Sequence, residues 1–313
     1  MFILNTQSYR WGSLIKPMAG SSEARNWPYQ RYGHTVVEHN NKIYLFGGRN
    51  DTQPCNILYC FDTVTFEWSR PLVCGLVPAA RDGHSAVVYD GSMYIFGGYE
   101  DSVEPFRPDV YKLDLNIFEW TLLKCKGEPP IYRDFHTATA IGDKMFIFGG
   151  RSDTTVQNMH INPFMNQQTE FYSDKLIYLV ILVELDEVRY SNSLFDLFHQ
   201  DLSTARWETP IIASPKPTGR RSHSALNLDG KLLIFGGYNG RRKEHMNDLW
   251  LLDPSTWRWT ELRPKGYGPE PRRRQAMCKV VSYFLVHSTL GVLAIKVCTF
   301  AKSRLGWFGL TFD

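Results

Sequence analysis

A pattern of fixed spacing recurs four times in this chain of 313 residues and constrains its fold more than any other feature. In each copy an Arg is followed three residues later by His and, twelve residues after the His, by Phe-Gly-Gly. Each copy closes with an Asp six residues before a Trp, and the next Arg follows thirteen residues after that Trp. The opening arginines are Arg31, Arg81, Arg133 and Arg220, and Arg272 begins a fifth copy with Gln275 at the His position. Recurrence over about 50 residues indicates a repeat protein.

Short apolar segments within each copy predict β-strands, because they are rich in β-branched and aromatic residues and are bounded by Gly, Asp and Asn. Residues 42–46 and 92–96 are examples, and Asn40-Asn41 and Asp90-Gly91 precede them as tight hairpin turns. The Gly-Gly pair permits a backbone turn in which a Cβ would clash. The closing Trp is large enough to fill the space between neighbouring sheets. Four-stranded sheets stacked radially, as in an all-β propeller, meet these requirements.

The order Arg-x-x-His-Ser/Thr, Phe-Gly-Gly, Asp-x5-Trp resembles the Kelch repeat, and the match covers roughly residues 31–275. The resemblance implies a six-bladed β-propeller of four-stranded blades. We expect four complete blades here, with a partial first blade and linker at 1–30, where the segment around Trp11 resembles the final strand of a blade. The propeller is expected at 31–279 with a long insertion at about 153–200, and a diverged apolar tail follows at 280–313.

Two segments depart from the repeat. From Gly150 to Asp201 the chain runs 51 residues, against 14 to 16 in the other copies. We interpret the excess as a polar surface loop at 154–170 and a strand with an added segment at 176–183. The tail either replaces the final blade, leaving the ring open with unpaired edges, or spans a membrane at 280–300. We expect no membrane span, because each charge there, such as Lys296, would cost about 3 kcal/mol.

Composition narrows the function classes. A net charge of +3 and a pI near 8.4 are far from the strongly basic profile of a dedicated nucleic-acid binder. The N-terminus has no basic start and only a short apolar run, so no signal peptide is predicted. The six cysteines show neither a disulfide framework nor a Cys-x2-Cys spacing. Reduced thiols in a cytoplasmic or nuclear protein are therefore expected.

Neither a metal, nor a cofactor, nor an enzyme activity is predicted. His34, His84, His136 and His223 recur once per blade, so they cannot converge on one ion and are expected to tie adjacent strands together. The iron-binding pattern of some Kelch relatives, Glu-x3-Asp-x3-His, fails because Leu252 follows Glu244 and Asp248 at the His position. No nucleophile elbow, phosphate-binding loop or His-Glu-x-x-His motif is present, and no small-molecule substrate is expected.

Arginines and tyrosines supply the candidate binding site. The residue after Gly-Gly and the start of the Arg-x-x-His strand of the same blade belong at the same end of an antiparallel hairpin, and so at one rim of the ring. Structural salt bridges, with Asp82 or Asp134, are the alternative for any single Arg. For the set we expect a concave basic mouth suited to carboxylates. The candidate residues are Arg49, Arg81, Arg133, Arg151, Arg220, Arg221, Tyr99 and Tyr238.

The resemblance also implies a function. Kelch domain-containing relatives are substrate receptors of cullin-RING ubiquitin ligases that capture protein C-termini, particularly those ending in glycine. Their carboxylate-holding positions fall here on Arg151, Arg220 and Arg221. Their adaptor-docking box, small-Leu-x3-Cys-x3-aliphatic, is not recognisable: Thr289-Leu290 begins such a pattern, but Ala294 stands at the Cys position.

Two other function classes fit the sequence less well. Other Kelch relatives, linked to recombination and chromatin, suggest a scaffold that binds histone tails, but cationic tails require an acidic rim and this rim is basic. DNA binding would need a continuous positive stripe, which no basic and aromatic module supports. The sequence therefore predicts a non-catalytic receptor for C-terminal peptides, with the chromatin scaffold as the alternative.

Overall fold

The computed structural model describes residues 2–5, 10–100, 108–152, 196–212, 215–266, 268–280, 283–288 and 296–299. These residues are almost entirely strands and turns, and α1 (Ser22–Asn26) is the one helix among them. The insertion predicted at 153–200, including the segment 176–183, falls almost wholly outside the described residues. The all-β prediction is confirmed.

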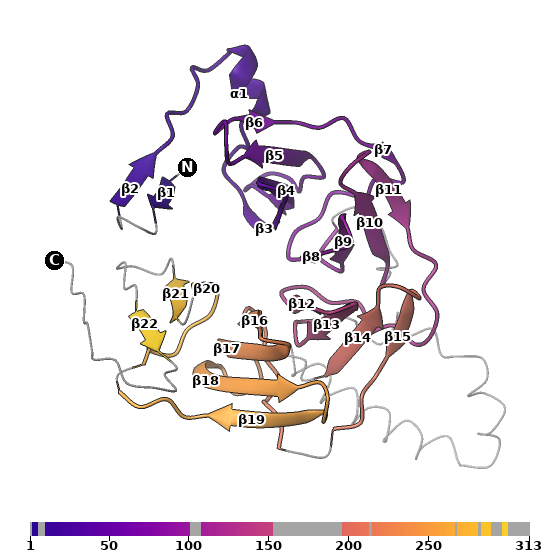
Figure 1. Cartoon of the computed structure of the whole chain (residues 1–313), viewed down its shortest axis with the longest axis vertical. Coiled ribbons are helices and arrows are strands. Elements are labelled where there is room, and N and C mark those ends of the chain that lie inside the picture. The colour runs from indigo at the N-terminus through magenta and orange to yellow at the C-terminus, as the bar shows by residue number, and fades with distance from the viewer. Residues whose placement is uncertain are drawn as a thin grey trace, which may run out of the picture.

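Four complete four-stranded blades follow one another around an arc (Figure 1). Each is an antiparallel meander in which the first strand lies innermost and the last outermost. Blade 1 contains β3 (Tyr32–His39), β4 (Lys42–Arg49), β5 (Leu58–Asp62) and β6 (Trp68–Ser69). Blade 2 contains β8 (Ser85–Tyr89), β9 (Ser92–Phe96), β10 (Val110–Asp114) and β11 (Glu119–Leu122), with β7 (Cys74–Gly75) parallel to β11. Blade 3 contains β12 (Thr137–Ile141), β13 (Lys144–Phe148), β14 (Leu197–Asp201) and β15 (Arg206–Glu208). Blade 4 contains β16 (Ser224–Leu228), β17 (Lys231–Asn239), β18 (Glu244–Asp253) and β19 (Arg258–Leu262).

Smaller sheets lie at the two ends of the arc. The strands β1 (Phe2–Asn5) and β2 (Arg10–Ser13), the second of which contains Trp11, form a hairpin. At the other end, β20 (Gln275–Val280), β21 (Tyr283–Ser288) and β22 (Lys296–Thr299) form a three-stranded antiparallel sheet. Part of the predicted tail is therefore sheet structure that continues the ring. No helix in the described part of the chain is long and apolar enough to cross a membrane.

Local turns follow from the repeated residues. Asn40 and Asn41 adopt φ of 51° and 58°, as a type I′ hairpin turn requires, and Asp90 and Gly91 repeat this geometry. The Asp before each Trp shapes the turn between the third and fourth strands: Asp62 Oδ1, for example, accepts hydrogen bonds from the backbone N–H groups of Val64 and Thr65 at 2.8 and 3.1 Å. The Asp-capped turn recurs in all four complete blades. The hairpin turn with two positive φ angles recurs in blades 1, 2 and 4, whereas in blade 3 Gly142 has a positive φ and Asp143 does not.

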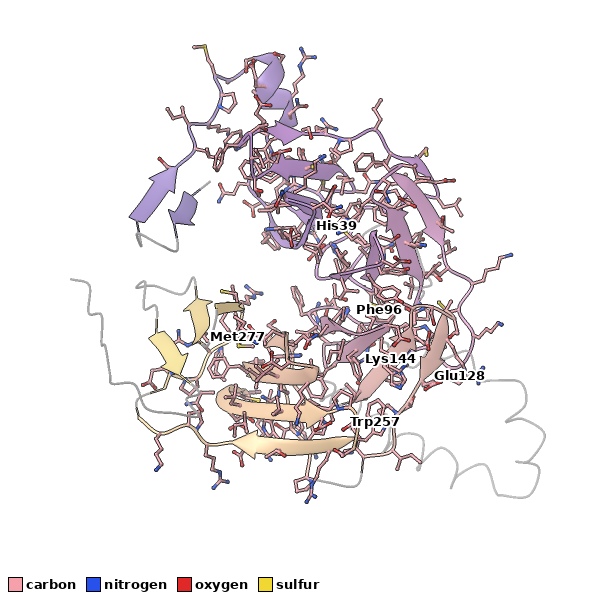
Figure 2. All side chains as sticks on the ribbon, in the orientation of Figure 1. His39, Phe96, Glu128, Lys144, Trp257 and Met277 are labelled. Atoms are coloured by element: carbon pink, nitrogen blue, oxygen red, sulfur yellow. The ribbon has the colours of Figure 1, made fainter. Side chains whose placement is uncertain are left out.

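The closing Trp packs between blades, as the sequence predicted. The rings of Trp120, Trp207 and Trp259 lie 5.1, 5.3 and 5.4 Å from the Phe that precedes Gly-Gly in the blade before. Those phenylalanines are Phe46, Phe96 and Phe148, all at most 1% exposed. Figure 2 shows side chains filling the spaces between the sheets, with Phe96 labelled. The core is thus a series of aromatic layers shared by successive blades.

The repeated histidines tie neighbouring blades together, which confirms their predicted structural role. A hydrogen bond joins Nε2 of His84, His136 and His223 to the Ser or Thr hydroxyl beside the corresponding position of the preceding blade, at 2.7–2.8 Å. Burial, and then the charge of the nearby repeat arginine, lowers the pKa of all three, and that of His223 falls to about 3. In the fifth copy, Gln275 fills the position and donates from Nε2 to the carbonyl of Phe235.

The free energy of unfolding should fall as the pH falls from about 6.5 towards 3. The unfolded chain binds protons at these histidines below its ordinary pKa of 6.5, whereas the folded chain does not. Each His should contribute a slope of about 1.4 kcal/mol per pH unit. Urea unfolding between pH 7 and pH 4.5 measures this slope. The pKa values of His34 and His199 are also lowered, so these two histidines add to the slope. His136→Gln, which introduces the residue type found at Gln275, should reduce the slope by the contribution of one His, about 1.4 kcal/mol per pH unit, and an unchanged slope would contradict the assignment.

Candidate binding site

The arginine that opens each repeat is part of the blade wall. Arg81, Arg133 and Arg220 are 3%, 0% and 0% exposed. In each, Nε donates to the carbonyl two residues earlier and Nη1 donates to the carbonyl of the first glycine of Gly-Gly. A carboxylate of the same blade completes the set: Glu100 for Arg81, Asp196 for Arg133 and Asp248 for Arg220. These guanidinium groups are fully occupied inside the protein.

This placement corrects the sequence-based assignment of Arg81, Arg133 and Arg220 to the binding surface. Their hydrogen bonds stabilise the hairpin itself, and each of their side-chain nitrogens has an acceptor among the described residues. Asp248, which matched part of an iron-binding pattern, accepts from Nη1 and Nη2 of Arg220 at 2.6 and 2.8 Å and from Nε1 of Trp250 at 2.7 Å. Burial alone would raise the pKa of Asp248, but the hydrogen bonds and charge of Arg220 outweigh it and lower the pKa.

The residue after each repeat arginine occupies the rim instead. Cross-strand pairs join it to the residue after Gly-Gly, and these pairs are Tyr32 with Arg49, Asp82 with Tyr99, Asp134 with Arg151, and Arg221 with Tyr238. The predicted meeting of the two positions at one end of the hairpin is therefore confirmed, with a shift of one residue. We call this rim, including Arg273 of the fifth copy, the mouth.

Two of the predicted mouth arginines form ion pairs with aspartates. Arg49 reaches Asp82 of the next blade, with 3.3 Å between Nη1 and Oδ1. Arg151 binds Asp134 of its own blade through both Nε and Nη2, at 3.1 and 2.6 Å. Asp82 and Asp134 were the partners considered from the sequence, and only the first pair crosses between blades. At blades 1 to 3 the mouth is thus close to electrically balanced.

Blade 4 carries a surplus cation. Burial lowers the pKa of Arg221, repulsion from Arg151 and Arg273 lowers it further, and the charge of Asp134 offsets part of this effect. Nη1 of Arg221 is buried and has no hydrogen-bond partner among the described residues. Arg221 and Arg273 both lie over the ring of Tyr238, with guanidinium carbons 5.2 and 4.7 Å from its centroid. A desolvated, partly unsatisfied guanidinium beside other cations is a site that an anion would stabilise.

Sequence reasoning missed two residues of this cluster, Arg273 and Arg274. The guanidinium carbon of Arg274 lies 5.9 Å from the ring centroid of Phe135, and that of Arg151 lies 5.7 Å from the same centroid. Both belong to the incomplete fifth copy, in which the Arg272-Arg273-Arg274 run was the available signal. The cluster therefore consists of Arg151, Arg221, Arg273 and Arg274 around Phe135 and Tyr238, and we call it the arginine cluster.

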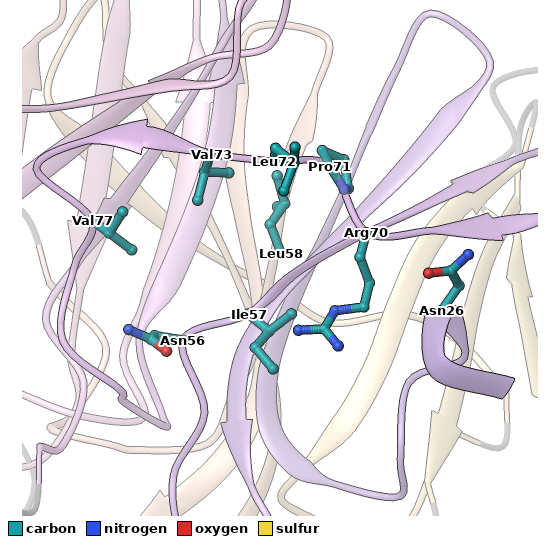
Figure 3. Close-up of a pocket in the computed structure, with 9 residues that line it drawn as sticks. All are labelled: Asn26, Asn56, Ile57, Leu58, Arg70, Pro71, Leu72, Val73 and Val77. Atoms are coloured by element: carbon teal, nitrogen blue, oxygen red, sulfur yellow. The ribbon is translucent and has the colours of Figure 1, made fainter. Parts of the chain in front are cut away.

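A separate hollow of about 470 Å³ lies at the outer edge, where blade 1 meets the chain leading to blade 2 (Figure 3). Its walls include Ile57, Leu58, Val73 and Val77, with Arg70 and Asn26 at the rim. None of the mouth residues lines it. Among the described residues no group of three or more His, Cys, Asp or Glu side chains is arranged to hold a metal ion.

Substitution of Arg220 should change the free energy of unfolding far more than substitution of its neighbour Arg221. Arg220→Ala should lower the free energy of unfolding by about 3 kcal/mol, because it removes the donor to the buried Gly236 carbonyl and to the Asp248 carboxylate, which is 25% exposed. Arg221→Ala should change it by less than about 1 kcal/mol, since it removes a charge that is desolvated and repelled. Urea denaturation of both variants measures the difference. Equal destabilisation by the two changes would place Arg221 in the wall as well.

Comparison with known proteins agrees with this architecture. The model of the KLHDC2/KLHL20/DRC7 Kelch-repeats domain matches residues 1–172 and 186–291. Kelch domain-containing protein 3 of Homo sapiens is 42% identical over 285 residues, which cover 89% of this chain and 66% of that protein, and the Bos taurus protein gives the same values. Host cell factor 2 of Homo sapiens is 30% identical over 72% of this chain and 29% of its own length.

The chain therefore spans just under two thirds of the length of Kelch domain-containing protein 3. Kelch propellers are in general non-catalytic modules that bind proteins. The repeat spacing, the stacked blades and the family match lead to one conclusion: the chain belongs to the Kelch-repeat family.

Proposed function

We propose that this chain is a non-catalytic receptor for protein C-termini, in which the arginine cluster holds the terminal carboxylate. The observation that carries the proposal is the buried, unsatisfied Nη1 of Arg221 beside Arg151. A carboxylate has two oxygens and can accept from the planar forks of two guanidinium groups at once. An anion of this shape would satisfy Arg221 and relieve the mutual repulsion of the cluster.

A terminal glycine suits such a site. The guanidinium groups are crowded against the rings of Phe135 and Tyr238, so a side chain next to the carboxylate would compete for the same space. The proposed ligand is therefore a peptide that ends in glycine with a free carboxylate. Histone tails are cationic, and Arg221, Arg273 and Arg274 would repel them; we do not favour the chromatin scaffold for that reason.

The proposed biological setting is the substrate-receptor role in a cullin-RING ubiquitin ligase, in the cytoplasm or nucleus. The support is the family membership together with the cationic mouth. The adaptor-docking box is not recognisable here, since Ala294 stands at the Cys position. Residues 289–295 lie outside the described part of the chain.

Fluorescence anisotropy with a glycine-terminated peptide tests the carboxylate site. The free acid should bind and the C-terminal amide should not, because the amide offers no charge to the arginines. Arg221→Gln should weaken binding at least about 30-fold, which corresponds to losing one partner of a buried charge pair. Arg263→Gln is the matched control, since Arg263 directly follows β19, is 84% exposed and pairs with Glu261. Equal binding of acid and amide would refute the proposal.

A further inference from the structure

The positive charge of the arginine cluster exceeds what one carboxylate can neutralise. Arg151 already pairs with Asp134. Arg221, Arg273 and Arg274, by contrast, have no carboxylate partner among the described residues. A terminal carboxylate carries one negative charge, so its binding would still leave a cationic surface at blade 4 and the adjoining fifth copy. Unbalanced charge that is partly desolvated is destabilising unless a ligand completes it.

Aromatic rings hold these guanidinium groups in place. Arg221 and Arg273 both lie within 5.2 Å of the Tyr238 ring centroid, so their guanidinium carbons are at most about 10 Å apart. Arg274 shares the ring of Phe135 with Arg151. Stacking on an aromatic face fixes a guanidinium plane before any ligand arrives, which reduces the entropy lost on binding. The surplus cations therefore form a fixed surface.

The hairpin of blade 4 adds further positive charge beside this surface. The strands β17 and β18 continue past Gly237, where Tyr238 pairs with His245 and Asn239 with Glu244. Their turn, residues 240–243, has the sequence Gly-Arg-Arg-Lys. The turn is held by the side chain of Asn239, whose Oδ1 accepts from the backbone N–H of Arg242 at 2.9 Å. Tyr238 thus links the arginine cluster to a basic turn on the same hairpin.

We propose that the arginine cluster selects C-terminal peptides with an acidic side chain close to the terminal glycine. This inference rests on the proposed function and specifies its substrate class: Arg221 with Arg151 holds the terminal carboxylate, and Arg273 and Arg274 hold an Asp or Glu side chain. An extended peptide advances about 3.3–3.6 Å per residue, so a span of about 10 Å places the acidic residue among the three that precede the glycine. Arg273 and Arg274 are specificity-determining residues in this arrangement.

The test compares matched peptides of one sequence that end in glycine with a free carboxylate. Glu and Gln are exchanged at each of the three positions before the glycine, and affinity is measured by anisotropy at two salt concentrations. At one position at least, Glu should bind about tenfold more tightly than Gln, as one charge-assisted hydrogen bond would provide. The preference should shrink at high salt, because Arg274 is exposed to solvent.

A double variant assigns the preference to the residues. Arg273→Gln with Arg274→Gln should reduce the Glu-to-Gln ratio to near one, while the free acid still binds more tightly than the amide. Circular dichroism confirms that the variant is folded. Equal affinity for Glu and Gln peptides at all three positions, with the free acid still bound, would overturn this inference and leave the carboxylate site standing. Failure of every free-acid peptide to bind would overturn both.

Discussion

The structure depends on one backbone hydrogen bond that is repeated between blades. The N–H of the second glycine of each Gly-Gly donates to the carbonyl of the next repeat arginine, in the pairs Gly48–Arg81, Gly98–Arg133, Gly150–Arg220 and Gly237–Arg272, at 2.8–3.0 Å. Side chains are excluded there: a Cβ at Gly97 would lie 2.6 Å from the carbonyl oxygen of Arg133. The same contact fixes the backbone at each repeat arginine, so its guanidinium turns into its own blade and the following residue reaches the mouth. Stability and the candidate site therefore share one constraint.

The fold could be predicted from the sequence because its determinants are local and periodic. The turns at Asn40-Asn41 and Asp90-Gly91, the Asp-capped turns and the closing Trp act within one blade or between adjacent blades, so their spacing survives in the sequence. The binding site was harder to predict from the sequence, because its residues follow the regularly spaced Arg of each repeat by one position. Periodicity drew attention to Arg220, which recurs because the blade needs it. The mouth is instead formed by Arg221, whose equivalents Asp82 and Asp134 are acidic.

The partners of the repeat arginines could not be predicted for a related reason. In blades 2 to 4 one carboxylate pairs with the repeat arginine, and these carboxylates belong to Glu100, Asp196 and Asp248. Each lies at a different sequence separation from its Gly-Gly pair, because the intervening loops differ in length. Blade 1 has no such acid: Arg31 donates to Sγ of Cys55 at 3.3 Å and lies over the rings of Tyr29 and Tyr59. Its buried Nη2 has no hydrogen-bond partner among the described residues. A thiol and two aromatic faces therefore take the place of a carboxylate, and no sequence spacing encodes that exchange.

The charge of the mouth differs from one side of the ring to the other. Identical blades would surround the axis with identical charge, and the field would not distinguish one side from another. The residue that follows each repeat arginine instead changes from copy to copy: it is Tyr32, then Asp82 and Asp134, and then Arg221 and Arg273. Ion pairs therefore balance the charge at blades 1 to 3, whereas Arg221 and Arg273 add positive charge at blade 4 and the fifth copy. An anionic chain end approaching the ring would be drawn to the cationic side, where burial strengthens the attraction. The repeat builds the wall, and the residues that depart from the repeat determine where a ligand would bind.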